Sequence, residues 1–377
     1  MATAPMSRTP FLDMAKGLAC TVIVAHHLAF YGPMSDIAQP LAPALIAWLY
    51  DYGRMAVQVF LVLAGYLAAA SLAPQGMARY DSAWQQALRR YTRLVTPYWV
   101  ALLATLAVSA LVRPWFAHDS VPGEPDGLQL LAHGLLLHGV LGYESLSAGV
   151  WYVAIDLQLF CCALLVWSTA RAVGRWRGSV QGAQHALRTA QALVVAGAAA
   201  SLWGFNRDAA WDNWALYFWG AYAMGIVAYW AVQSARPLGW LLVLGLLAGV
   251  ALWLDLRPRI AVAGTAALLL VVVMRSPLLR AWGWAPLVQL GQRSYSVFLI
   301  HFAVCLLVNA VASRWWPPVP AVQAVGMVLA WGLSLVAGQL LYVGVESRST
   351  DLRSALRWLV GLLLTGGLLE AYALATA

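Results

Sequence analysis

The chain has 377 residues, of which 62% are hydrophobic and 10% are charged, and its net charge is +8. Soluble domains carry about 25% charged residues, so this composition excludes a soluble globular protein and indicates a polytopic membrane protein. The positive charge does not indicate a nucleic-acid partner, because the arginines lie in short loops between apolar runs.

Eleven apolar runs are long enough to be membrane spans, since a helix needs about 20 residues to cross the bilayer. They cover residues 12–31, 55–73, 94–112, 150–170, 189–205, 214–232, 238–254, 260–274, 295–312, 321–343 and 358–375. Ten of these runs form the expected core, and the eleventh is an additional C-terminal helix. Because no internal repeat or soluble segment is present, the sequence predicts an all-α protein with a single integral-membrane domain over residues 1–377.

Basic residues are unevenly distributed between the two sides of this topology. With a cytoplasmic N-terminus, 17 of the 23 lysine and arginine residues, Arg8 among them, lie in inner segments and six in outer ones. Cytoplasmic loops carry the excess of such residues, so we expect a multi-pass protein with a cytoplasmic N-terminus and an outer C-terminus. All four cysteines lie in apolar spans without the spacing of metal ligands, so no metal site and no disulfide framework are expected.

The first span, Phe11–Phe30, contains one lysine and two adjacent histidines within an apolar sequence. An ionisable group at the centre of a membrane helix costs about 2.5 kcal/mol or more and by default marks a functional site. His27 is a candidate general base for a hydroxyl group, and His26 is expected to point elsewhere. The alternative is that both histidines hydrogen-bond to neighbouring helices. Lys16 is a second candidate site residue, or a membrane anchor paired with Asp13 one turn away.

Two connecting segments are longer than turns. Residues 79–93 form a basic amphipathic stretch, which we expect to lie on the inner membrane interface before the third span begins. Arg89, Arg90 and Arg93 are candidates for binding phosphate groups, and the alternative is that they only fix the topology. The outer segment 113–149 starts with Pro, Gly and acidic residues and then becomes apolar over a run too short to cross. This run predicts one short re-entrant or interfacial helix.

Asp156 is a carboxylate near the outer end of the fourth span, about 10 Å below the surface at the helical rise. Such a carboxylate needs a partner. One candidate is His27, whose imidazole a carboxylate would orient and stabilise as in acid–base catalysis. The other is Arg54, at the outer mouth of the second span. In the ninth span, His301 follows Tyr295, and its imidazole either lines a cofactor tunnel or bonds to a neighbouring helix.

Six stretches of the chain match, in order, the motifs of one family of membrane proteins. FLDMAKGLACTVIVAHH is similar to an opening motif in which Arg is followed after ten residues by His, with Lys16 at the Arg position and His27 at the His position. VQVFLVLAGYL is similar to FFVLSGFL, and RRYTRLVTPYW matches a basic run that leads to PYW. VWYVAIDLQLF resembles WSLSVEWQFY, with Asp156 at the acidic position. LGQRSYSVFLIHF resembles LGKISYSLYLIHF, and YVGVESR resembles a closing E-R-P element. Together these motifs resemble the membrane-bound acyltransferase-3 family.

The resemblance implies an inner-membrane O-acyltransferase that takes an acetyl group from acetyl-CoA on the cytoplasmic side. The implied acceptor is a hydroxyl of a carbohydrate, as in polysaccharide modification, or of a lipid-linked molecule at the extracytoplasmic side. The implied catalytic residues are His27 and Asp156. The candidates for binding acyl-CoA are Lys16, Arg89, Arg90, Arg93, Tyr295 and His301, and those for binding the acceptor are His26, Arg54, Trp151 and Gln158. The alternative is a transporter or flippase of lipid-linked saccharides, which often shows repeats or broken helices in matching halves; none is seen here.

Overall fold

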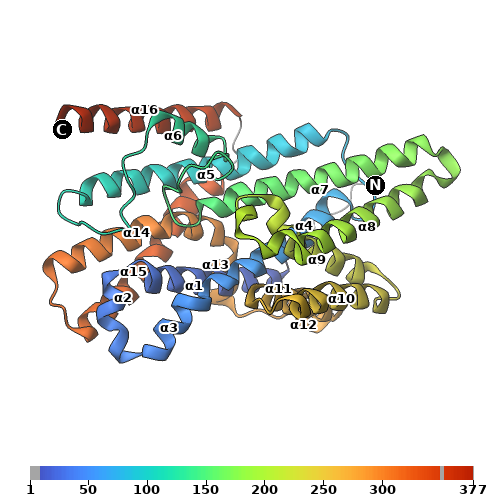
Figure 1. Cartoon of the computed structure of the whole chain (residues 1–377), viewed down its shortest axis with the longest axis horizontal. Coiled ribbons are helices and arrows are strands. Elements are labelled where there is room, and N and C mark those ends of the chain that lie inside the picture. Colours follow the sequence, from blue (N-terminus) through green and yellow to red (C-terminus); the bar gives the residue numbers. More distant parts are fainter. Residues whose placement is uncertain (1–8, 349–351, 377) are drawn as a thin grey trace. The chain divides into compact units, whose positions relative to one another are not determined.

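The computed structural model of the chain describes residues 9–348 and 352–376, so Arg8 lies outside the described part (Figure 1). The described residues form helices of several lengths and no strand. Nine helices within this part are long and apolar enough to cross a membrane, when α3 (Pro43–Tyr52) and α4 (Val57–Leu72) are counted as one. The protein is therefore an all-α, polytopic membrane protein.

Each of the eleven predicted spans coincides with a helix. In chain order these helices are α1 (Pro10–Phe30), α4 (Val57–Leu72), α5 (Ala83–Val112), α7 (Val150–Trp176), α8 (Ser179–Trp203), α9 (Ala215–Gln233), α10 (Leu238–Leu254), α11 (Pro258–Arg275), α14 (Ser294–Trp315), α15 (Pro320–Leu341) and α16 (Leu352–Thr376). α10 has 17 residues, which makes it an apolar helix shorter than the nine. It begins and ends at the predicted residues.

Shorter helices occupy several connections. α2 (Pro33–Ala38) and α3 (Pro43–Tyr52) lie between the first two spans and were not predicted. Each begins with a proline at its first turn, a position where proline's fixed φ favours the helix and no backbone donor is lost. α6 (Gly127–Gly134) is the short helix predicted in the outer segment, and the Asp126 side chain caps it by accepting from Gln129 N. α12 (Pro277–Ala281) and α13 (Ala285–Gln292) precede α14.

The basic segment 79–93, which was predicted to lie on the inner membrane interface, is continuous with the third span. From Ala83 onward it is the beginning of α5, which continues without interruption for 30 residues. No glycine or proline lies between Ala83 and Arg93, and most of the residues there are strong helix formers. Helix propensity therefore continues from the basic segment into the third span.

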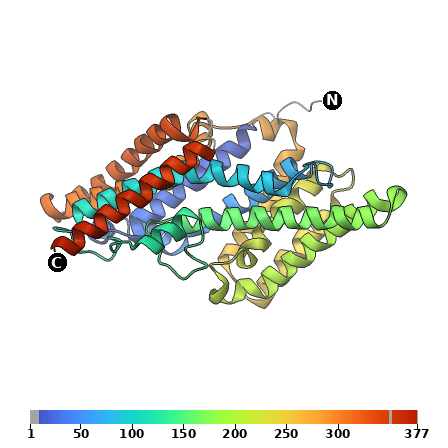
Figure 2. The same ribbon diagram turned by 90° about the horizontal axis from the view of Figure 1, so that it is seen from above.

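The chain divides into two compact units, and the boundaries fall within α1, α5, α7 and α13 and in the turn between α3 and α4. The first unit takes in the described residues up to Lys16, together with Met55–Arg89 and Ile155–Gln289. Its central helix is α9, which packs against α4, α8, α10 and α11 and buries nearly all of its side chains. In the same unit, α7 and α8 meet at their short connection and diverge from it (Figure 2).

Glycines bring α4 and α9 into backbone contact. A Cβ atom added to Gly65 would lie 1.9 Å from the carbonyl oxygen of Tyr222, and one added to Gly225 would lie 1.9 Å from that of Val62. Neither position accepts a side chain. Close approach through small residues is the usual way in which membrane helices associate, because no hydrophobic force drives them together within lipid.

The second unit comprises Gly17–Arg54, Arg90–Ala154 and the described residues from Leu290 onward. In it, α14 and α15 lie side by side, and α2 packs against both (Figure 1). Gly338 of α15 allows this packing, since a Cβ there would lie 2.2 Å from the Val297 side chain. Most of the side chains of α14 are buried, which places its single histidine in the interior of this unit.

Candidate active site

The helices α1 and α14 run parallel and in register. Cys20 Sγ donates to the carbonyl oxygen of Ser294, and His27 contacts His301, so two contacts share the sequence separation of 274. The second contact follows the first by seven residues on both helices, which is about two helical turns. This register brings together two residues that belong to distant parts of the sequence.

His27 and His301 form a buried hydrogen-bonded pair. The distance from His27 Nδ1 to His301 Nε2 is 2.6 Å, and the two ring planes are 5° from parallel. His27 is 9% exposed and His301 is 0% exposed. The sequence predicted that His301 either binds a cofactor or bonds to another helix, and the structure shows the second of these contacts.

The bonds of this pair determine which nitrogen of each neutral ring carries the proton. His301 Nδ1 lies 2.7 Å from the carbonyl oxygen of Phe298, which can only accept, so Nδ1 is the donor. In the neutral ring His301 Nε2 is then an acceptor, and His27 Nδ1 must donate to it. The lone pair of His27 is thereby assigned to Nε2. Among the described residues, no hydrogen bond engages that nitrogen.

His26 points to a different element from its neighbour. Its Nδ1 lies 2.8 Å from the carbonyl oxygen of Leu49 on α3, to which it donates. Gly53 makes room for the ring, since a Cβ there would lie 2.7 Å from His26 Cβ. His26 and His27 therefore point to different helices, as expected. Arg54, which was predicted to bind the acceptor, is an exposed residue of the turn between α3 and α4.

The beginning of α7 packs against α14 beside the histidine pair. The rings of Tyr152 and Phe298 are 5.5 Å apart, and the rings of Trp151 and Tyr152 are 6.2 Å apart. Gly149 has a φ of +85° and would place a Cβ 2.8 Å from the Phe298 ring, so only glycine fits before this helix. Phe298, whose carbonyl ends the hydrogen-bonded chain, is therefore held from the α7 side.

The start of α14 is fixed by two further polar contacts. Tyr295 Oη donates to the carbonyl oxygen of Leu94, 2.8 Å away. Ser296 donates from its hydroxyl and its backbone nitrogen to Glu346, which lies in a π-helical turn (Tyr342–Glu346) at the end of α15. Such turns often occur at functional sites. Tyr295, predicted to bind a cofactor, has its hydroxyl engaged in this packing.

Lys16 forms the predicted ion pair with Asp13. The distance between Nζ and Oδ1 is 3.0 Å, and the second carboxylate oxygen of Asp13 is buried without a hydrogen-bond partner among the described residues. Lys16 precedes His27 by eleven positions on α1, about 16 Å at the helical rise. The remaining predicted cations, Arg89, Arg90 and Arg93, lie in the first three turns of α5, where Arg89 and Arg93 are exposed.

Asp156 and Gln158 belong to the part of α7 in the first unit. Asp156 is buried, and its predicted pairing with His27 or Arg54 stays a prediction. Gln158 caps the start of α9: its Oε1 accepts from Ala215 N at 2.9 Å and its Nε2 donates to Asn213 O at 3.4 Å. Both polar atoms of the Gln158 side chain, which was predicted to bind the acceptor, are therefore hydrogen-bonded to the backbone of the protein.

A family model for an acyltransferase domain matches residues 9–338. The chain belongs to the acyltransferase-3 family. Searches among curated proteins and among solved structures found no match. Membership of the acyltransferase-3 family establishes an acyltransferase with multiple membrane helices.

The histidine pair joins two of the motifs through which the sequence resembles the acyltransferase-3 family. His27 ends the opening motif, and His301 lies near the end of LGQRSYSVFLIHF. Reasoning from the sequence identified both residues but missed their contact, and it missed the carbonyl of Phe298 because no residue type marks a backbone acceptor. The equal spacing from Cys20 to His27 and from Ser294 to His301 is visible only once the two helices are paired.

Proposed function

We propose that this acyltransferase is an O-acetyltransferase of the cell inner membrane. It takes an acetyl group from acetyl-CoA on the cytoplasmic side and transfers it to a hydroxyl of a carbohydrate or lipid-linked acceptor at the extracytoplasmic side. The observation that carries the proposal is the chain of hydrogen bonds from Phe298 O through His301 to His27, which leaves the lone pair of His27 Nε2 as the one that takes a proton.

The reaction assigned to this chain is general base catalysis. His27 Nε2 accepts the proton of the acceptor hydroxyl while its oxygen attacks the carbonyl carbon of the thioester. The resulting tetrahedral intermediate collapses by breaking the carbon–sulfur bond, and His27 Nε2–H returns the proton to the leaving thiolate. The products are an ester and the free thiol of CoA. His301 holds the ring of His27 in the required tautomer, which is the part that a carboxylate plays in serine hydrolases.

The donor side of the proposal rests on charge. Lys16, Arg89, Arg90 and Arg93 are the cations assigned to the phosphate groups of acetyl-CoA, since lysine and arginine both pair with phosphate. Lys16 stands where the family motif has arginine, so it supplies a point charge in place of a planar fork. Asp156 is assigned to stabilising the positive charge that forms on His27. Because His27 Nδ1 already donates to His301, this carboxylate acts on the charge and not on that nitrogen.

The test uses acetyl-CoA labelled with ¹⁴C in the acetyl group and membrane vesicles that contain the protein. Inverted vesicles, which expose the cytoplasmic face, should transfer label to the glycolipid or glycan fraction, and right-side-out vesicles should not. Mild alkali should release the label, because esters are cleaved under conditions that leave amides intact. Vesicles with His27→Ala provide the background. Alkali-stable label, or equal labelling with either vesicle orientation, would overturn the assigned chemistry or the assigned side.

A further inference from the structure

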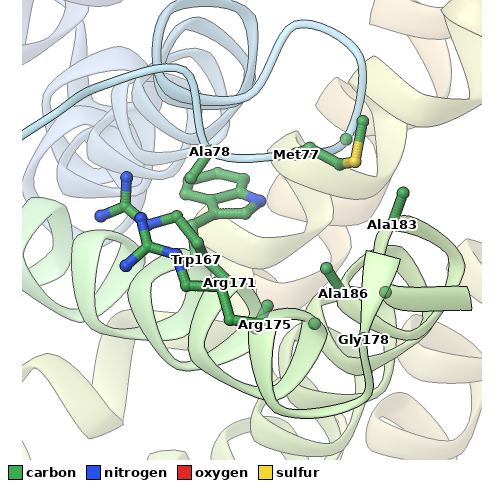
Figure 3. A pocket seen from close by; sticks show the side chains of 12 residues that line it. Met77, Ala78, Trp167, Arg171, Arg175, Gly178, Ala183 and Ala186 are labelled. Atoms are coloured by element: carbon green, nitrogen blue, oxygen red, sulfur yellow. The ribbon is translucent and has the colours of Figure 1, made fainter. Parts of the chain in front are cut away.

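A cavity of about 550 Å³ lies in the first unit, and its lining includes neither residue of the histidine pair (Figure 3). It is lined by the connection between α4 and α5 and by the hairpin of α7 and α8. Its volume is in the range of small-molecule sites, which is about 300–1,000 Å³. Nothing in the proposed acyl transfer uses this cavity.

Three glycines that line the cavity stand where a side chain would clash or strain the backbone. A Cβ added to Gly174 would lie 2.7 Å from the carbonyl oxygen of Gly182, and one added to Gly182 would lie 2.4 Å from that of Gly174. Gly76 has a φ of +80° and would place a Cβ 2.4 Å from Leu187. Small residues thus bring the two helices together and leave space beside them.

The nitrogen-bearing side chains that line the cavity, Trp167, Arg171 and Arg175, are all hydrogen-bond donors. Trp167 is 1% exposed, and its Nε1 is buried without a hydrogen-bond partner among the described residues. Arg175 is exposed and has no partner in the described part of the chain, whereas Arg171 donates to the carbonyl oxygen of Tyr80 and lies 4.9 Å over its ring. An indole N–H and a guanidinium can only donate, so the matching ligand must supply acceptors.

The charges at the cavity select an anion. Arg171 and Arg175 are one helical turn apart and project in the same direction from α7 (Figure 3). Like charges at this spacing repel each other. Among the described residues that line the cavity there is no carboxylate to separate them. A phosphate group, with several acceptor oxygens and a negative charge, fits between two such cations.

The end of α7 indicates that the ligand comes from the membrane. Trp176 follows Arg175 directly and is 78% exposed, and the guanidinium of Arg177 lies 4.8 Å over its ring. Exposed tryptophans of this kind are typical of the level of the lipid headgroups. Basic pockets between membrane helices at this level bind the headgroups of anionic lipids.

We infer that this cavity binds the headgroup of an anionic phospholipid. Arg171 and Arg175 pair with the phosphate oxygens, Trp167 Nε1–H donates to an oxygen of the phosphate or the glycerol ester, and the wall of small residues contacts the glycerol and the first methylene groups. The site shares no residue with the histidine pair, so the inference does not rest on the proposed acyl transfer.

The test is a lipid titration of the purified full-length protein in a mild detergent, read by native mass spectrometry. Phosphatidylglycerol should bind at least about tenfold more tightly than phosphatidylcholine of the same chain length. Arg175→Gln should lower the affinity for phosphatidylglycerol about tenfold, because it removes a charge-assisted hydrogen bond. Trp167→Phe keeps the aromatic ring and removes only the N–H, so it should lower the affinity about threefold.

Arg177→Gln is the matched control, since it removes an arginine two residues further along that does not line the cavity. This variant should bind phosphatidylglycerol like the parent protein. Equal affinity for the two lipids, or equal losses in Arg175→Gln and Arg177→Gln, would overturn the inference. A nucleotide ligand is the competing source of phosphate. Binding of 3′,5′-ADP that depends on Arg175 and displaces phosphatidylglycerol would reassign the cavity to a nucleotide.

Discussion

The protein contains two buried histidine pairs that look alike and are bonded differently. The rings of His27 and His301 and those of His133 and His138 are both nearly parallel, with centroids 4.8 Å and 4.1 Å apart. In the first pair one ring donates to the other, and the second ring donates to a backbone carbonyl. In the second pair the rings stack face to face and no hydrogen bond joins them.

The nitrogens show why only one pair is suited to proton transfer. His133 donates from Nδ1 to Gln129 O and accepts at Nε2 from Leu146 N, so both of its nitrogens are occupied by the backbone. Both nitrogens of His138 are buried without a hydrogen-bond partner among the described residues, so nothing selects its tautomer. His27 is the intermediate case, with one nitrogen fixed and the other left as the acceptor. A general base needs that asymmetry more than it needs burial.

The largest expected effect compares the same truncation at the two pairs. His27→Ala should lower turnover at least about 100-fold, because it removes the group that accepts the proton. His138→Ala should leave turnover per folded molecule within about twofold. The measurement is release of CoA thiol by purified protein, normalised to the monodisperse fraction in size-exclusion chromatography. Equal losses in the two variants would show that the bonding difference has no catalytic meaning.

The second effect concerns the chain that orients His27. His301→Leu should lower kcat at least about tenfold with little change in KM for the acyl donor, because the ring of His27 loses the acceptor that fixes its tautomer. His301→Gln should recover part of the rate, since its carbonyl oxygen accepts from His27 Nδ1. The pH dependence of kcat/KM should also change in His301→Leu, which a purely structural defect would not produce. If His301→Gln is as slow as His301→Leu and the pH profile is unchanged, His301 serves packing alone.

The third effect separates two roles of Lys16. Lys16→Gln removes the ion pair with Asp13, a buried carboxylate, and loses stability for that reason. The double variant Asp13→Asn/Lys16→Gln removes both charges and should recover the stability. If Lys16 binds the donor phosphates, KM for acetyl-CoA should stay about tenfold higher in both variants and return to near the parent value in Lys16→Arg. Recovery of KM in the double variant would limit Lys16 to neutralising Asp13.

The fold was largely predictable because bilayer thickness sets the length of each helix. The run 238–254 was predicted to the residue, since Pro237 and Asp255 flank an apolar sequence without interruption. At 79–93 the sequence predicted a basic stretch before the third span, and the structure adds that from Ala83 onward this stretch belongs to the same helix as the span. The helices α2 and α3 were missed, although Pro33 and Pro43 mark their first turns.

The candidate site was predictable in its residues and not in its contacts. The cost of an imidazole within a membrane span identified His27 and His301 from their position alone. Their bond depends on the pairing of α1 with α14 across 274 residues, which no local pattern encodes. His26 bonds to a backbone carbonyl on α3, a helix that was not predicted. The sequence therefore could not show where the His26 ring points.

The smallest expected effect falls on the stacked pair and leaves turnover at neutral pH unchanged. Burial lowers the pKa of His133 to about 4 and that of His138 to about 3, against an ordinary value near 6.5 in the unfolded chain. Between pH 6.5 and about 4 the unfolded chain therefore binds protons that the folded protein does not, and stability must fall as the pH falls. At pH 5.5 His138 alone should lower the free energy of unfolding by about 1 kcal/mol.

His138→Leu should remove that part of the acid sensitivity and should not destabilise the protein at pH 7.5, since it replaces an imidazole whose nitrogens have no partner in the described structure. Thermal melts in detergent at pH 7.5, 6.5 and 5.5 give the comparison, with His185→Leu on α8 as the control for the loss of a histidine outside the pair. A Tm that falls with pH as steeply in His138→Leu as in the parent protein would show that the acid sensitivity arises elsewhere.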